Sequence, residues 1–433
     1  MPPLLLDLLY VPAFLGFLPV LLYQKLVMKK NRGGWAQRFG FVPARGGNRK
    51  AIWVHAVSLG EVNATRSLVS ELERRLPDHD VFLSATTDTG YAAACKHYDA
   101  SRVIRYPLDF SFVVNRVLDR VRPAMVILME LEVWPNFIEL CHRRGIPVGI
   151  ANGRVTEEKS MRRFRKPAIR ALARSMFRRI DWIGAQDETY AARFVELGAQ
   201  AEAVKVTGSM KYDTAVVGSS VEGDEELARE MGIDRARPLL VAGSTGPDEE
   251  EMVLAAYGEL RERVPGLQLA IVPRKPERFD EVARLIESRS YACVRRSKRD
   301  TAPSGAVFLG DKMGELRKFY SLASVVFVGR TLVPMGGSDL MEVAALGKPM
   351  CFGPYVENFA DAAEKLGRAD AAVQISSVVE FATAIQRMLA DPAAADAMGR
   401  RAQAVVQQNV GATGRTVDLV CACLTKASPQ PHP

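Results

Sequence analysis

The chain of 433 residues is long enough for two ordinary domains, and its 48% hydrophobic and 25% charged residues exclude a largely disordered protein. Six scattered cysteines and five histidines give neither a disulfide framework nor metal-ligand spacing, which indicates reduced thiols in the cytoplasm. A net charge of +8 favours an anionic partner, such as a membrane surface, nucleic acid or a phosphorylated substrate.

Residues 3–23 are almost wholly apolar, apart from Asp7, Pro12 and Pro19. A signal peptide would carry its positive charges before such a run, whereas here they follow it. The run is about long enough to span a bilayer, and its acid and prolines also permit a helix lying in the interface. We therefore predict that residues 1–32 form an uncleaved membrane anchor that need not belong to a domain core. The basic residues that follow the run are Lys25, Lys29, Lys30 and Arg32.

After this segment, short β-branched runs alternate with helical patterns, for example at Ala64–Arg75 and Phe112–Val121. Such alternation predicts βαβ units and a parallel sheet. The expected strands of the first half are Ala51–Val57, Val81–Ala85, Met125–Met129, Val148–Ala151 and Trp182–Ala185.

The pattern restarts after residues 216–236, which are rich in Gly, Ser and charge. The sequence thus predicts an α/β protein with two Rossmann-like halves that enclose a cleft. A run of helix is expected from about Glu380, followed by a disordered tail at residues 428–433. The expected strands of the second half are Leu239–Ala242, Leu267–Val272, Ala292–Val294, Val307–Leu309, Val325–Val328 and Pro349–Phe352.

The segment Trp53–Glu61 reads as a buried strand, a tight turn and a helix that begins near Val62. It places the Glu61 carboxylate at the carboxyl end of a strand, where ligands bind in open α/β sheets. Glu61 is therefore either a general base acting on a bound hydroxyl or a residue that caps the helix.

Glu130 and Glu132 follow the expected strand at Met125–Met129 and point to the same edge as Glu61. Either they serve the site, or they cap a helix that starts near Pro135. The hydroxyl-rich loop at residues 85–90 is open to a similar choice between binding sugar or phosphate oxygens and capping a helix.

The segment at residues 160–179 is strongly basic. If a helix begins near Pro167, then Arg170, Arg174 and Arg178 share one face. That face is either a solvated helix surface or a contact with anionic lipid.

Three weak motifs at strand ends in the second half together favour a nucleotide site. The cations of Pro273–Arg278 suit phosphate or carboxylate. Asp311–Leu316 opens a helix, and Gly336–Glu342 is a glycine turn whose N–H groups suit a phosphate.

Taken together these residues resemble the 3-deoxy-D-manno-octulosonic acid (Kdo) transferase family over nearly the whole chain. The matching segments are the apolar N-terminus, Trp35–Gly40, Ser58–Glu61, Glu130–Asn136, Gly208–Asp213, Ser244-Thr245 with Glu249-Glu250, Pro273–Phe279, Met313–Leu316, the Gly336-Gly337 turn and Gly353–Phe359.

The resemblance implies a GT-B fold, with an acceptor domain at residues 33–220 and a donor domain at residues 221–427. It implies inverting transfer of Kdo from CMP-Kdo to a lipid A precursor (lipid IVA), without metal or cofactor. Glu61 would be the base, and Glu130 and Lys211 would stabilise the transition state. The residues implied to hold CMP are Pro273, Arg274, Met313, Gly314, Glu315, Asp339, Leu340, Met341 and Glu342.

The resemblance also implies a place at the inner membrane, with the catalytic domains on the cytoplasmic side. The expected partners are the lipid acceptor and the anionic membrane surface, and no nucleic acid is expected.

The donor half departs from the family pattern. Gly246, Lys275 and Ser338 stand where the family has histidines, Asp339 replaces an asparagine, and Arg330 replaces a small residue. An acid near a phosphate is unfavourable unless Lys275 or Arg330 compensates it. Two alternatives therefore stay open: a GT-B transferase that uses another nucleotide sugar on a lipid, and a non-catalytic membrane-bound homologue with a degenerate donor site.

Overall fold

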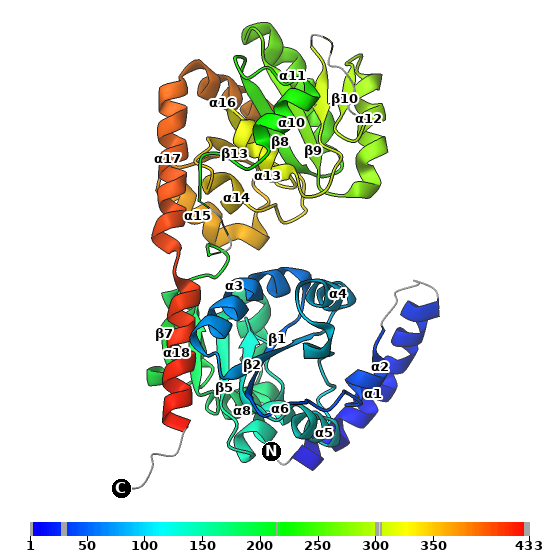
Figure 1. Cartoon of the computed structure of the whole chain (residues 1–433), viewed down its shortest axis with the longest axis vertical. Helices are drawn as coiled ribbons and strands as arrows, with labels where there is room; N and C mark the ends of the chain where they lie inside the picture. Colours follow the sequence, from blue (N-terminus) through cyan, green and yellow to red (C-terminus); the bar gives the residue numbers. More distant parts are fainter. Residues whose placement is uncertain are drawn as a thin grey trace. The chain divides into compact units, whose positions relative to one another are not determined.

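The computed structural model describes residues 3–26, 33–213, 215, 217–298, 303 and 305–427. Contacts divide the chain into two compact units, Met1–Thr214 with Val410–Pro433 and Ala215–Asn409. Each unit contains a seven-stranded sheet (Figure 1), which confirms the predicted α/β class with two parallel-sheet halves. The predicted tail and the basic residues Lys29, Lys30 and Arg32 lie outside the described residues.

The sheet of the first unit has the strand order β3-β2-β1-β4-β5-β6-β7, and all its strands are parallel. The order reverses between β1 and β4, and ligands bind outside the carboxyl ends of the strands at such a switch point. The predicted strands are confirmed to within a few residues, whereas the short edge strands β3 and β7 were missed. The strands are β1 (Lys50–Ala56), β2 (His79–Ala85), β3 (Val103–Arg105), β4 (Pro123–Met129), β5 (Val148–Gly153), β6 (Trp182–Ala185) and β7 (Val204–Val206).

Helices cover both faces of this sheet, with one apolar cluster around Trp53 and Phe137 and another around Leu68 and Val417. The helices are α1 (Pro3–Leu26), α2 (Trp35–Arg38), α3 (Leu59–Arg75), α4 (Asp88–His97), α5 (Ser111–Val121), α6 (Pro135–Arg143), α7 (Arg162–Phe164), α8 (Pro167–Phe177), α9 (Glu188–Glu196) and α18 (Ala412–Ala427). Short turns of other helix types are η1 (Ala100–Arg102), η2 (Glu157–Met161) and η3 (Ala201–Ala203).

The last helix, α18, belongs to the first unit, although its residues were expected in the domain at 221–427. It packs against α3, β5 and β6, and Val417 and Val420 are fully buried. The chain therefore crosses back to the first unit after Asn409.

The N-terminal helix α1 runs through Pro12 and Pro19 and packs on α5 and α6. Leu6 is only 4% exposed, so one face of α1 belongs to the first unit, contrary to the expectation of a segment outside its core. Among the residues that the structure describes, no helix has the length and apolar content needed to cross a membrane.

The sheet of the second unit has the order β10-β11-β9-β8-β12-β13-β14, with its switch point between β8 and β12. Its strands are β8 (Leu239–Thr245), β9 (Gln268–Pro273), β10 (Cys293–Arg295), β11 (Val307–Leu309), β12 (Val325–Val328), β13 (Met350–Phe352) and β14 (Val373–Gln374). The helices are α10 (Asp224–Met231), α11 (Glu249–Arg263), α12 (Phe279–Ser288), α13 (Leu316–Leu322), α14 (Met341–Ala344), α15 (Ala360–Arg368), α16 (Val378–Ala390) and α17 (Pro392–Asn409), with the short turns η4 (Pro276–Arg278) and η5 (Glu357–Phe359). Helix α10 lies within the Gly-, Ser- and charge-rich stretch 216–236, and Leu227 and Met231 on one side of it are buried.

Candidate functional site

Glu61 lies in the first turn of α3, directly after β1. Its carboxylate accepts hydrogen bonds from the Val57 N–H at 2.9 Å and the Ser58 hydroxyl at 3.0 Å. Burial raises the pKa of Glu61 to about 7; the Val57 N–H opposes this rise, and the charge of Glu130 adds to it. Glu61 therefore makes capping contacts and also has a pKa suited to accepting a proton near neutral pH.

Glu130 follows β4, the strand that pairs with β1 at the switch point. The register aligns His55 with Leu128, so the turns that carry Glu61 and Glu130 are neighbours. The backbone of Glu130 has a φ of 56°, and its N–H donates to the Ala151 carbonyl at 2.9 Å. A left-handed conformation is unusual for a residue other than glycine and is common at functional sites.

The two acids after β4 do not cap α6, so that interpretation is wrong. The cap is the Asp109 carboxylate, which accepts two N–H groups in the first turn of α6, from Asn136 at 3.0 Å and from the next residue at 2.8 Å. Glu132 instead accepts a hydrogen bond from the Trp134 indole at 3.2 Å. Within the described part of the chain, the Glu130 carboxylate has no hydrogen-bond or ion-pair partner, so it is available to a ligand.

Lys211 lies beyond β7 in a turn that is fixed on both sides. Asn152, at the end of β5, accepts the Met210 N–H at 3.0 Å. Asp213 accepts the N–H groups of Gly411 at 2.6 Å and Thr413 at 2.5 Å, and so holds the start of α18. Sequence reasoning missed Asn152, which the structure marks by its left-handed φ of 55°.

The hydroxyl-rich loop before α4 acts as a helix cap. Thr87 Oγ1 accepts the Gly90 N–H at 3.1 Å and donates to the Val57 carbonyl at 3.0 Å. This observation supports the capping alternative, and it also ties the loop to the turn that bears Glu61.

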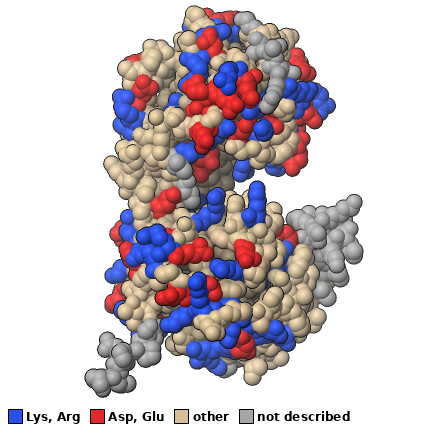
Figure 2. All heavy atoms as spheres, viewed as in Figure 1, with Lys and Arg blue, Asp and Glu red and all other residues tan. Residues whose placement is uncertain are grey.

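The predicted basic helix begins at Pro167, as expected. Arg170, Arg174 and Arg178 are all exposed, and none of them forms an ion pair with another described residue. Figure 2 shows Lys and Arg side chains over the part of the first unit that contains α8. The helix thus has an exposed cationic face.

In the second unit, one buried carboxylate fixes two loops at the switch point. Glu249 accepts backbone N–H groups from Gly246 at 2.9 Å and from residues 330–332 at 2.5 to 2.9 Å. These loops follow β8 and β12. Arg274, after β9, joins them because its N–H donates to the Thr245 carbonyl at 3.0 Å.

The glycine turn places two acids close to each other. Asp339 accepts the Met341 N–H at 2.9 Å, and the Gly337 N–H donates to the Arg330 carbonyl at 2.9 Å. Burial raises the pKa of Glu342 to about 7, the charge of Asp339 adds to this rise, and the charge of Arg274 opposes it.

The charges of Arg274 and Arg317 both act on Glu342 and lower its pKa. Compensation of Asp339 by Lys275 or Arg330 stays a prediction. The Arg330 guanidinium donates to the Met335 carbonyl at 3.0 Å.

Several residues predicted to bind the nucleotide have side chains that are buried or already bound to other residues. The Glu315 carboxylate binds Arg296 at 2.7 and 3.1 Å, and Arg296 also binds Glu230 at 2.6 Å. Leu340 and Met341 are buried. These residues can offer a ligand their backbone groups, whereas Arg274 and Met313 are exposed.

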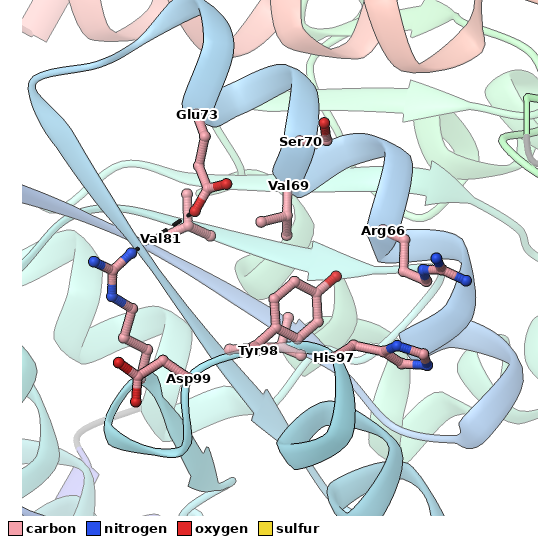
Figure 3. Close-up of a pocket in the computed structure, with 10 residues that line it drawn as sticks. Arg66, Val69, Ser70, Glu73, Val81, His97, Tyr98 and Asp99 are labelled. Carbon is pink, nitrogen blue, oxygen red and sulfur yellow. Dashed lines mark ion pairs between the residues drawn. The ribbon is translucent and has the colours of Figure 1, made fainter.

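Two cavities in the first unit lie apart from these residues. One of about 540 Å³ is lined by residues of β6 and α18, among others. The other, of about 410 Å³, lies between α3, β2 and the turn after α4, where Tyr98 faces α3 and Glu73 pairs with Arg102 at 3.7 Å (Figure 3). Neither is lined by Glu61, Glu130 or Lys211.

Among the described residues, no three His, Cys, Asp or Glu side chains are grouped as a metal ion would require. Metal independence itself stays a prediction.

Comparison of the sequence with known proteins places the chain in a family. Residues 33–214 match the family model of 3-deoxy-D-manno-octulosonic-acid transferase (kdotransferase). The chain is 32% identical to the 3-deoxy-D-manno-octulosonic acid transferase of Haemophilus influenzae, over 89% of this chain and 90% of that protein. It is 33% identical to the protein of the same name from Bordetella pertussis, over 95% of this chain and 98% of that protein.

The structure also resembles a glycosyltransferase from Rickettsia africae, with a TM-score of 0.58 over 88% of this chain and 100% of that chain. The sequence identity is 11%, so this likeness shows a shared fold alone. The sequence matches extend over nearly the full length of both Kdo transferases, and the chain therefore belongs to the Kdo transferase family of glycosyltransferases.

Proposed function

We propose that this protein is an inverting GT-B glycosyltransferase that moves Kdo from CMP-Kdo to a lipid A precursor. The observation that carries the proposal is Glu61, whose pKa is raised to about 7 at the switch point beside Glu130. The reaction class is supported by two relatives named Kdo transferase, whose sequences are similar to this one over most of the chain.

The proposed reaction is a direct displacement. Glu61 takes the proton of an acceptor hydroxyl while that oxygen bonds to the anomeric carbon of Kdo. The bond from this carbon to the phosphate oxygen of CMP breaks, CMP leaves with the electron pair, and the configuration inverts. Glu130 and Lys211 would stabilise the transition state, with Lys211 offsetting the growing negative charge. The reaction as proposed uses neither a metal nor a bound cofactor.

The donor would be held at the second switch point. The exposed Arg274 suits the CMP phosphate, since a charge-assisted hydrogen bond is stronger than a neutral one. Met313–Glu315 and Leu340–Met341 would contribute backbone groups, because the Glu315 carboxylate is bound to Arg296 and Leu340 and Met341 are buried. Glu342 would accept ribose hydroxyls.

We further propose that the protein works at the cytoplasmic face of the inner membrane. Leucines of α1, including Leu4, Leu8 and Leu15, are 78, 69 and 59% exposed. Apolar side chains on one face of a helix and exposed arginines elsewhere suit an anionic lipid surface.

A donor panel tests the proposed function. Purified protein and lipid IVA would be incubated with CMP-Kdo, CMP-sialic acid and UDP sugars, and lipid products would be identified by mass spectrometry. Transfer from CMP-Kdo alone is expected. Transfer from a UDP sugar would favour the second candidate, a transferase with another donor, which the Asp339–Glu342 pair motivates. No transfer and no nucleotide binding would identify a non-catalytic homologue.

A further inference from the structure

Two helices beside the candidate site lack caps of their own. The residues before α5 and α6 are Phe110 and Trp134, and neither side chain caps its helix. Asp109 caps α6, as described above. The cap of α5 comes from α1, because Asp7 accepts the Ser111 N–H at 2.8 Å and also the Ser111 hydroxyl. An uncapped helix start leaves buried N–H groups unpaired, which is costly.

Asn136, the second residue of α6, connects the two capping carboxylates. Its side-chain amide donates to Asp7 at 2.8 Å and to the Asp109 carbonyl at 2.7 Å. The Tyr10 hydroxyl donates to the Asp109 carboxylate at 2.9 Å. Helix α1 thus supplies two of the polar groups that hold the start of α6, and α6 follows directly on the turn that carries Glu130.

The same face of α1 makes aromatic contacts with the first unit. Asp7, Tyr10 and Phe14 recur at helical spacing and therefore share a face. The Tyr10 ring lies 5.9 Å from Phe110, and the Phe14 ring lies 6.2 Å from Phe110 and 6.5 Å from Phe39. These polar and aromatic contacts hold α1 in one specific position on the first unit. An anchor that only tethers the protein to a membrane would not need them.

We propose that α1 is a positioning element of the active site: Asp7 and Tyr10 hold Asn136 and Asp109, and through them the turn at Glu130–Trp134. Without these contacts, the Ser111 N–H and the Asn136 amide lose buried partners, and the turn that bears Glu130 gains freedom. Small displacements of a group that stabilises the transition state reduce turnover more than binding. The kinetic part of this inference rests on the proposed function.

The kinetic test uses the full-length protein in detergent micelles that contain the lipid acceptor, so that delivery to a membrane is not limiting. Asp7→Ala is expected to lower kcat about tenfold with an unchanged KM for CMP-Kdo. Asp7→Asn should retain most of the activity, because its amide oxygen can still accept the Ser111 N–H. Asp119→Ala, which removes a 66% exposed carboxylate from α5, is the matched control and should behave as wild type. Full turnover by Asp7→Ala would show that α1 only tethers the protein.

A second test does not depend on catalysis. Hydrogen exchange at the backbone N–H groups of Ser111 and Asn136 should become faster in Asp7→Ala. The Tyr190 N–H, which Asp187 caps at 2.7 Å, serves as the internal control and should not change. Unchanged exchange at Ser111 and Asn136 would overturn the inference even if the protein transfers no Kdo.

Tyr10→Phe keeps the ring and removes only the hydroxyl bonded to Asp109, so it tests the inference if Asp7→Ala does not fold. It should speed exchange at Asn136 and leave Ser111 unchanged. Equal exchange at Asn136 in Tyr10→Phe and wild type would contradict the role of α1 at α6.

Discussion

At the carboxyl edge of the first sheet, Glu61 has a pKa of about 7 and Glu130 stands without a partner among the described residues. At the corresponding edge of the second sheet, Glu249 accepts four backbone N–H groups and Glu315 binds Arg296. Acids of the first edge are thus available for proton transfer and charge stabilisation, whereas most acids of the second edge build the loops. The contacts of an acid, and not its place after a strand, distinguish the two roles.

The largest effect is expected from Glu61→Gln. The amide keeps the shape but cannot take a proton, so kcat should fall by about two to four orders of magnitude. CMP binding, measured by calorimetry, should persist because the residues proposed to hold CMP belong to the other unit. Glu71→Gln, on the same helix and paired with Arg74 at 2.6 Å on the surface, is the control and should keep normal turnover.

Glu249→Ala should show that the corresponding acid of the second unit is structural. Loss of the carboxylate leaves buried N–H groups of Gly246 and residues 330–332 without an acceptor, so the free energy of unfolding should fall by about 3 kcal/mol. Denaturant titration measures this fall, and Glu251→Ala on the exposed side of α11 is the control. A variant as stable as wild type would remove the contrast between the two edges.

Arg274→Ala tests the charge that the second edge leaves exposed. Calorimetry should show CMP binding weakened by about 1.5–3 kcal/mol, the usual worth of a hydrogen bond to a charged group. The exposed Arg284 of α12 offers a matched control, since Arg284→Ala removes the same charge elsewhere in the unit. Equal affinity of both variants would place the phosphate away from Arg274.

The smallest effect is expected from Asp339→Asn. The amide oxygen can still accept the Met341 N–H, so the turn is kept while a negative charge near the phosphate is removed. CMP should bind a few-fold tighter, by up to about 1 kcal/mol, as for other partly exposed charge pairs. The pKa of Glu342 should fall, because Asp339 helps to raise it. Weaker CMP binding by this variant would mean that the Asp339 charge itself serves the ligand.

The alternation of strands and helices predicted both sheets, because long buried strands leave a clear apolar run. The edge strands β3, β7 and β14 were missed because two or three residues carry no such signal. Glu61 was predictable as a strand-end acid. Its raised pKa was not predictable, because the pKa depends on burial and on Glu130, which lies far along the chain.

The roles of Asp7, Asp109 and Asn152 were also beyond sequence reasoning. Each holds a backbone N–H of a distant segment, at Ser111, Asn136 and Met210 respectively, and no local pattern marks such a contact. The return of α18 to the first unit depends on Asp213 in the same way.

The pH dependence of Kdo transfer tests the central claim most directly. A base must be unprotonated to act, so a Glu61 pKa of about 7 predicts that kcat/KM rises with pH and levels off above 7. The rise in kcat/KM should follow the titration of a single group. The residual activity of Glu61→Gln should not show this rise. A wild-type profile that is flat from pH 5 to 8, or a rise that persists in Glu61→Gln, would contradict Glu61 as the base.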